Sequence, residues 1–136
     1  MEVVARDVYK RQGAALFDVA LTTVDEIVES AGLSDVGFIK IDVDGYEARV
    51  LRGARQTLTR QRPPIMIELS YLSHDLGDSV PAFINEIYSS GYVVVTMAGE
   101  VATAAQVLDG FPWHTSFDVL MLPAELARDS ACPALK

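Results

Sequence analysis

The protein is a chain of 136 residues, of which 50% are hydrophobic and 22% are charged, with a net charge of −8. These values indicate a single globular domain, and the negative charge argues against nonspecific binding to nucleic acid and against docking on an anionic membrane. No apolar run approaches the roughly 20 residues that span a bilayer, and the one cysteine, Cys132, permits no internal disulfide, so a cytoplasmic location is expected.

Helix and strand patterns alternate from the first third of the chain onward. Residues 21–33 are predicted to form a helix, because Thr23 and Glu26 have the spacing of a capping box. Residues 36–43 follow as a strand that is apolar at nearly every position except Lys40. Such a run is typical of a parallel strand that is covered on both faces.

A helical pattern then begins at Gly45 and continues to the sequence QRPP, where proline ends it. Residues 64–70 form a second buried strand. Residues 79–91 are predicted to form a helix, with Ser79 as its cap.

The last part of the chain is predicted to contain two more strands. Residues 92–97 form the third strand, a short helix is expected at 103–110, and residues 116–123 form the fourth strand. The remaining residues, 124–136, are expected to be a flexible tail.

This order of elements implies an open α/β sheet. The first three strands are expected to be parallel, because helices connect them as crossovers. The last strand is expected to pair antiparallel with the third, as a C-terminal hairpin at the edge of a mostly parallel sheet.

Acidic residues lie where two predicted strands end. In open parallel sheets, ligands bind beyond the carboxyl ends of the strands, and Asp42 and Glu68 occupy such positions, followed in the first case by Asp44, Gly45 and Glu47. These carboxylates could act as a general base, as acceptors for ribose or ammonium groups, or as ligands for a hard cation. Asp44 fits the cap of the following helix equally well. No metal site is predicted, since the acidic spacing does not match a calcium loop.

Two enzyme families share an apolar run that ends in a pair of acidic residues. Haloacid-dehalogenase-like phosphatases begin with apolar residues and then Asp-x-Asp-Gly-Thr, which would make Asp42 the nucleophile and Asp44 the acid. Tyr46 replaces the threonine of that pattern, and no later acidic pair or catalytic lysine follows a suitable strand.

The chain more closely resembles the FkbM-type methyltransferases, which use S-adenosylmethionine. The carboxyl-terminal half of that family has a TTLDE-like helix, then IKIDVEGxExxVLxGA, then a strand that ends in glutamate. The corresponding segments are LTTVDEIV at 21–28, IKIDVDGYEARVLRGA at 39–54 and PIMIELS at 64–70, in the same order. Asp44 stands where the family usually has glutamate, and the resemblance extends over residues 21–123.

The resemblance implies a partial Rossmann-like sheet and methyl transfer to a hydroxyl oxygen of a small-molecule or glycan acceptor, often a sugar or a natural product. It implies Asp42 as the first candidate for the catalytic proton acceptor and Glu68 as the second. It also implies Asp42, Asp44, Gly45 and Glu47 as candidate cofactor-binding residues. The main cofactor motif of the family, a glycine-rich turn after the first strand of the domain, is absent from this sequence.

Residues 13–123 are therefore interpreted as the C-terminal half of a methyltransferase domain. Residues 1–12 are interpreted as a sequencing-library artefact or a disordered leader, because DVYKRQ can be encoded by a transposon end used to prepare such libraries. We expect the chain alone to be inactive and to bind S-adenosylmethionine weakly or not at all. The missing strands should leave an exposed strand edge, which favours self-association. A non-enzymatic half-domain that pairs with another chain is the remaining alternative.

Overall fold

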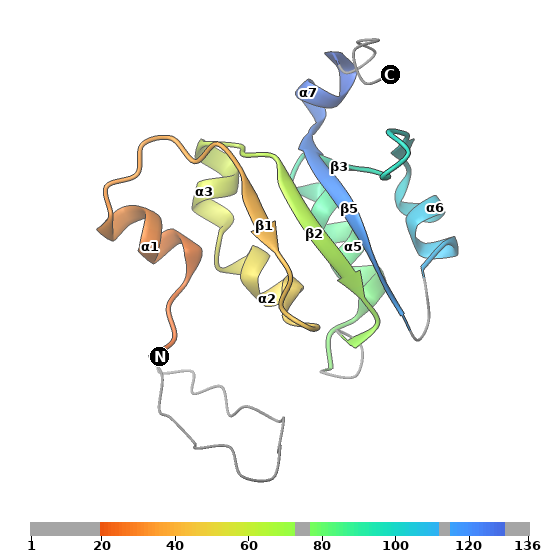
Figure 1. Ribbon diagram of the computed structural model, residues 1–136, viewed down its shortest axis with the longest axis horizontal. Helices are drawn as coiled ribbons and strands as arrows, with labels where there is room; N and C mark the ends of the chain where they lie inside the picture. Colours follow the sequence, from red (N-terminus) through yellow and green to blue (C-terminus); the bar gives the residue numbers. More distant parts are fainter. Residues whose placement is uncertain (1–19, 73–76, 112–114, 130–136) are drawn as a thin grey trace, which may run out of the picture.

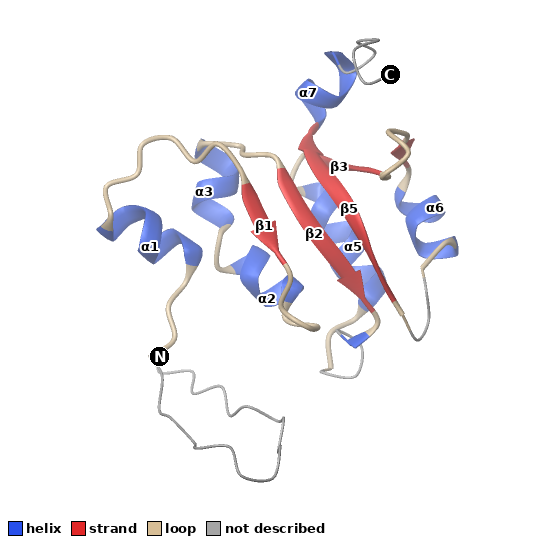
Figure 2. Ribbon diagram, viewed as in Figure 1, coloured by secondary structure: helices blue, strands red, loops and turns tan. Residues whose placement is uncertain are grey.

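The computed structural model describes residues 20–72, 77–111 and 115–129, which form a five-stranded mixed sheet with helices packed against it (Figure 1, Figure 2). Residues 1–12 and 130–136, which include the predicted artefact segment and most of the predicted tail, lie outside these ranges. The elements, in chain order, are α1 (Val24–Ser30), β1 (Ile39–Ile41), α2 (Glu47–Arg52), α3 (Arg55–Arg60), β2 (Ile65–Ser70), α5 (Val80–Ser89), β3 (Tyr92–Val95), β4 (Val101–Ala102), α6 (Ala104–Asp109), β5 (Ser116–Pro123) and α7 (Ala124–Asp129). Within the described ranges, no helix has the length and apolar character needed to cross a membrane.

The strand order in the sheet is β1-β2-β5-β3-β4. Only β1 and β2 pair in parallel, and the other three pairings are antiparallel, so the prediction of a mostly parallel sheet is wrong. The predicted common direction of the first three strands is nevertheless confirmed. Because β2 and β3 are both antiparallel to β5, strands β1, β2 and β3 all run the same way.

The last strand is also placed differently from the prediction. It does pair antiparallel with β3, but it also pairs with β2 along six residues, so it lies inside the sheet and not at its edge. An inserted strand is hydrogen-bonded to a neighbouring strand on both sides, whereas an edge strand is bonded on one side only. The edge beyond β3 is formed by β4, a strand of two residues that is too short to leave a pattern in the sequence.

One face of the sheet carries the core. Ile41, Ile67 and Val119 lie side by side in the strand register and are almost fully buried. Figure 1 shows α2, α3 and α5 behind this face. Their buried apolar side chains complete the core, among them Ala48, Leu51, Leu58, Phe83, Ile84 and Ile87.

The opposite face has no helix over it in the described part of the chain (Figure 1). The prediction that the first strand is covered on both faces is therefore wrong, since the Lys40 side chain is 55% exposed and Phe38 is 53% exposed. The strand is also shorter than predicted, with three residues in place of eight. We call this uncovered face of the sheet the open face.

The helix caps predicted at Thr23 and Ser79 are confirmed. Thr23 and Glu26 form a complete capping box at α1, and the Ser79 hydroxyl accepts a hydrogen bond from the first turn of α5. The helix predicted from Gly45 onward is divided into α2 and α3, with the break at Gly53 and Ala54.

The C-terminal segment differs from the prediction, whereas the edge strand of the sheet agrees with it. Where a flexible tail is predicted from residue 124, the structure has α7, whose Glu125 forms an ion pair with Arg62 beyond the end of α3. In the described residues β1 pairs with β2 alone, so β1 is the expected exposed strand edge.

Candidate functional site

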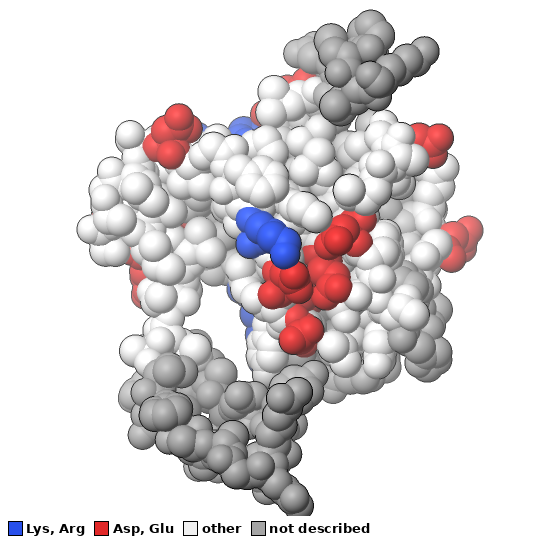
Figure 3. All heavy atoms as spheres, viewed as in Figure 1, with Lys and Arg blue, Asp and Glu red and all other residues white. Residues whose placement is uncertain are grey.

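Three carboxylates from three neighbouring strands lie at one level on the open face. Glu68 of β2 is directly opposite Asp118 of β5 in the strand register. Asp42 follows Ile41, which pairs with Ile67, so Asp42 reaches the level of Glu68 at the carboxyl end of β1. We call Asp42, Glu68 and Asp118 the acidic row. Figure 3 shows a group of acidic side chains on the face nearest the viewer, beside a basic one.

Lys40 is the basic group at this site. Its ammonium group lies 2.8 Å from the Asp42 carboxylate, and both side chains are about half exposed. The hydrogen bond and charge of Asp42, together with the charges of Asp118 and Glu68, raise the pKa of Lys40 above its ordinary value. Lys40 therefore stays charged at neutral pH and offsets part of the negative charge of the row.

The last strand supplies two side chains to this site. Asp118 extends the acidic row, and the Ser116 hydroxyl donates a 2.5 Å hydrogen bond to Glu68. Neither residue is among those predicted from the sequence. Asp118 interrupts the apolar run 116–123 in the way that Asp42 interrupts its own strand, which is a usable signal. Only the insertion of β5 beside β2 shows that this signal belongs to the same site.

The turn after Asp42 has an unusual backbone. Asp44 has φ of 50° and Gly45 has φ of 99°, so two successive residues adopt left-handed conformations. Helix α2 begins later than predicted, with Tyr46 at its N-cap and no side-chain capping bond. Asp44 is therefore not the cap of this helix, and it lies exposed in the turn.

Glu47 supports this turn from inside the protein. Its side chain is fully buried, and its carboxylate accepts hydrogen bonds from the backbone N–H groups of Gly45 at 3.1 Å and Val43 at 3.3 Å. Of the four residues predicted to bind a cofactor, Asp42 and Asp44 thus face solvent. Gly45 and Glu47 are buried and form the support that holds them in place.

The arrangement is suited to binding cationic or hydroxyl groups. Carboxylates accept hydrogen bonds from ammonium and hydroxyl donors and can take up a proton as a general base. Within the described ranges, no group of three or more His, Cys, Asp or Glu side chains is arranged to hold a metal ion. The acidic row is spread across three strands, and its members do not converge on one point.

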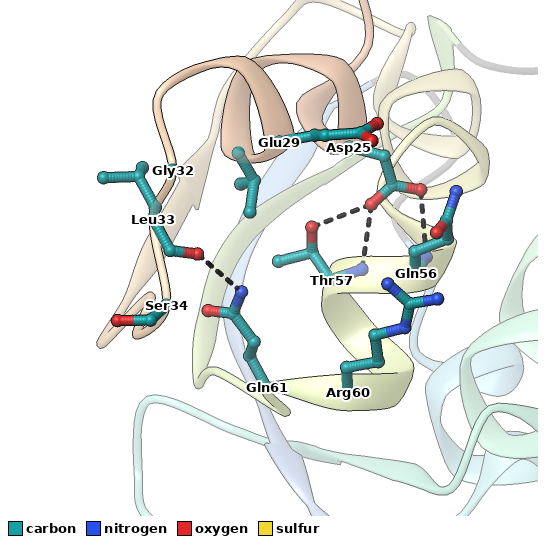
Figure 4. Close-up of a pocket in the computed structure, with 10 residues that line it drawn as sticks. Asp25, Glu29, Gly32, Leu33, Ser34, Gln56, Thr57, Arg60 and Gln61 are labelled. Carbon is teal, nitrogen blue, oxygen red and sulfur yellow. Dashed lines mark hydrogen bonds between the residues drawn. The ribbon is translucent and has the colours of Figure 1, made fainter.

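A hollow lies between α1 and α3, with a volume of about 250 Å³ (Figure 4). Its polar groups are largely occupied with one another. Asp25 points toward the first turn of α3, and the Gln61 side chain bonds the Leu33 carbonyl and the Val36 N–H. No member of the acidic row lines this hollow. We interpret it as the junction that attaches α1 to α3.

Comparison with known proteins adds one match. The family model described as the methyltransferase FkbM domain matches residues 4–94, about two thirds of the chain. The matched range contains Asp42 and Glu68 and ends before β5, which carries Asp118. No curated protein and no solved structure matches the chain.

Proposed function

The chain belongs to the methyltransferase FkbM domain family, in agreement with the resemblance of its motifs, and from this membership we propose that the acidic row is one wall of an S-adenosylmethionine-dependent methyltransferase site. The observation that carries the proposal is that Asp42, just beyond the carboxyl end of β1, lies level with Glu68 in the second half of the adjacent parallel strand β2, which ends at Ser70. This is the part of an open α/β sheet where ligands bind.

The residues of this wall fit part of the cofactor. S-adenosylmethionine supplies a methyl group on a positively charged sulfonium. The exposed carboxylates of Asp42 and Asp44 can accept hydrogen bonds from ribose hydroxyls or an ammonium group, and the negative acidic row favours a nearby positive charge. The sequence has no glycine-rich turn after a strand, so the carboxylate and adenine of the cofactor lack evident partners. We therefore propose that this chain alone binds the cofactor weakly and is inactive.

Asp42 is our first candidate for the group that accepts the proton of the acceptor hydroxyl. In such a transfer the new carbon–oxygen bond would form as the bond between the methyl group and the sulfonium sulfur breaks, the cofactor would leave as a neutral thioether, and the proton of the acceptor hydroxyl would pass to a carboxylate oxygen. Asp42 is about half exposed, so an acceptor hydroxyl can reach its carboxylate. Glu68 is second, because it is less exposed than Asp42 and one of its oxygens accepts the Ser116 hydroxyl.

We propose a hydroxyl group of a sugar or a natural product as the acceptor, on the basis of family membership. The family match also favours methyl transfer over the phosphatase alternative. An activity assay distinguishes the methyltransferase from the phosphatase. A magnesium-dependent phosphatase activity that is lost in Asp42→Asn would support the phosphatase.

The cofactor proposal is tested first on the chain as it is. We expect a calorimetric titration with S-adenosylmethionine to show no binding or only weak binding. Micromolar affinity for the wild-type chain, lost in Asp42→Asn, would instead mean that this wall suffices for binding.

The catalytic proposal is tested on a longer protein that restores a glycine-rich turn upstream of residue 13, if the source DNA encodes one. Transfer of a labelled methyl group to sugar and natural-product acceptors is measured for the wild type, Asp42→Asn and Glu68→Gln. We expect Asp42→Asn to lose a factor of about 100 or more, the typical contribution of a positioned base. Asp109→Asn, on α6, is the matched control and should retain full activity. Equal activity of Asp42→Asn and the control would refute the role of Asp42.

A further inference from the structure

Strand β5 brings two polar side chains beside Glu68, because it lies next to β2 in the sheet (Figure 1). In the strand register Asp118 is directly opposite Glu68, and Ser116 is opposite Ser70, two residues nearer the carboxyl end of β2. Alternate residues of a strand share one face of the sheet, so both side chains stand with Glu68 on the open face. The family match ends at residue 94, before β5, and therefore assigns no role to either of them.

The two residues of β5 act on the Glu68 carboxylate in opposite ways. Like charges directly opposite each other on antiparallel strands destabilise the pair, and their Cβ atoms are only about 4.5–5.5 Å apart. Asp118 therefore disfavours a Glu68 side chain that extends straight across to β5. A diagonal neighbour is about 7–8 Å away, within reach of a long side chain. The Ser116 hydroxyl occupies this diagonal position and donates its hydrogen bond to Oε1 of Glu68.

This hydrogen bond engages one oxygen of Glu68 and leaves the other free. Its length of 2.5 Å is typical of a hydroxyl that donates to an ionised carboxylate, which is one of the stronger hydrogen bonds in proteins. Within the described ranges, Ser116 is the one donor to Glu68, and Oε2 has no hydrogen bond. Glu68 is only half-buried, so Oε2 can accept a hydrogen bond from a bound molecule.

The hydrogen bond also sets the direction in which Glu68 extends. Because Ser116 is opposite Ser70, it draws the carboxylate along β2 toward the carboxyl end of that strand. Ligands of open α/β sheets bind beyond this end of the strands. Asp42 lies just beyond the carboxyl end of the adjacent strand β1, level with Glu68. Ser116 thus turns Glu68 toward the part of the sheet where Asp42 lies.

We propose that Ser116 is a positioning residue of the methyltransferase site. It holds Glu68 so that the free oxygen accepts a hydrogen bond from a hydroxyl group of the bound acceptor, while Asp42 takes the proton of the reacting hydroxyl. This inference rests on the proposed function. Ser116 acts through Glu68 and does not itself touch the acceptor, so its loss should weaken acceptor binding and leave the chemical step nearly unchanged.

The first test uses the chain as it is and measures the order of the Glu68 side chain. Three-bond NMR couplings report how χ1 of Glu68 is distributed among the staggered rotamers. The wild type is compared with Ser116→Ala, which removes the hydroxyl, and Ser116→Thr, which keeps it. Thr115→Ala removes the exposed hydroxyl of the neighbouring residue and is the matched control. Ser116 is exposed, so we expect every variant to fold, and the amide spectra verify this.

We expect couplings of a single χ1 rotamer for the wild type, Ser116→Thr and Thr115→Ala. Ser116→Ala should give couplings averaged over two or three rotamers. Averaged couplings in the wild type would overturn the proposal. Unchanged couplings in a folded Ser116→Ala would overturn it as well, because Glu68 would then be held by something other than Ser116.

The second test measures whether this order serves the site, and it uses the longer protein with which the role of Asp42 is tested. The kcat and the KM for the acceptor are measured in the wild type, Ser116→Ala and Ser116→Thr. An interaction that is equally strong in the bound substrate and in the transition state affects KM and leaves kcat unchanged. We expect Ser116→Ala to raise KM about fivefold, the typical effect of losing one hydrogen bond. Ser116→Thr should restore KM to the wild-type value.

The outcomes separate this inference from the proposed function. An active wild type whose KM is unchanged in Ser116→Ala would refute the positioning role and leave the proposed function standing. A loss of kcat as large as that of Asp42→Asn would overturn the assignment of Glu68 to acceptor binding. A wild type that transfers no methyl group would refute the proposed function, and the NMR comparison would then decide by itself whether Ser116 orders Glu68.

Discussion

The carboxylate of Asp25, on α1, caps α3 at Thr57, 32 residues further along the chain. One oxygen accepts the Thr57 N–H at 2.8 Å and the Thr57 hydroxyl at 2.7 Å, and the other accepts the Gln56 N–H at 2.9 Å. Burial acts to raise the pKa of Asp25, but the three hydrogen bonds and the charge of Arg60 outweigh it and lower the pKa. The aspartate of the TTVDE segment thus has a structural role that the sequence alone did not reveal.

Replacing Asp25 should destabilise the junction between α1 and α3. Asp25→Asn keeps one acceptor oxygen but loses the charge. The N–H and the hydroxyl of Thr57, which is buried, then lose part of their hydrogen bonding. We expect a loss of about 1–2 kcal/mol in the free energy of unfolding. Urea denaturation measures it. Asp35→Asn, at an exposed position between α1 and β1, is the control and should change stability little.

A side chain at Gly53 should strain the same junction. A Cβ atom there would lie 3.2 Å from both Cβ and Cγ2 of Thr23. Thr23 is held by its capping box and cannot move away freely. We expect Gly53→Ala to cost about 1 kcal/mol. Thr23→Ser removes Cγ2 and keeps the cap hydroxyl, so Gly53→Ala should cost less in that background. Equal costs in a double-mutant cycle would show that the two residues do not interact.

The turn that holds Asp42 and Asp44 should depend on the buried Glu47. Glu47→Ala leaves the N–H groups of Gly45 and Val43 without this acceptor, and we expect a loss of about 2–3 kcal/mol. Glu47→Gln retains one acceptor oxygen and should cost less. Hydrogen exchange at the amide of Gly45 is the local measurement. Unchanged protection in Glu47→Ala would contradict the supporting role.

The left-handed backbone at Asp44 gives a separate prediction. Glycine adopts φ of 50° without a steric penalty, whereas a residue with a Cβ atom does so at a cost. Asp44→Gly should therefore be more stable than Asp44→Ala, by about 1 kcal/mol. Thermal or urea unfolding of the two variants measures this difference. The reverse order would mean that Asp44 does not have this conformation in solution.

The ion pair between Arg62 and Glu125 should make stability depend on pH in the acidic range. Arg62 lowers the pKa of Glu125 from 4.5 to about 2. A pKa lowered in the folded state stabilises the protein above the unfolded value, and this stabilisation is lost as the pH falls from 4.5 toward about 2. The effect is small because Glu125 is exposed. Comparison of the wild type with Glu125→Gln across this range tests it, since the difference should shrink toward low pH. Glu100→Gln is the exposed control.

The acidic row shows where sequence reasoning succeeds and where it ends. Strand direction and the carboxyl-end rule correctly placed Asp42 and Glu68 together, because a crossover helix leaves little choice of direction. They did not place Asp118 or Ser116, since a strand after a hairpin can return to either edge or insert between others. That choice depends on pairing with β2, nearly 50 residues away in the chain.

The sequence by itself determined the helices α1, α5 and α6, the caps at Thr23 and Ser79, the strand before Asp42 and the family of the protein. These follow from contacts over a few residues and from a continuous motif, which a linear pattern records. The tertiary structure decided the strand order, the open face, the inward turn of Glu47 and the cap from Asp25 to α3. Each of these features depends on which distant segments pair with one another and on which groups become buried. Long-range pairing and burial of this kind leave no local periodic pattern in the sequence.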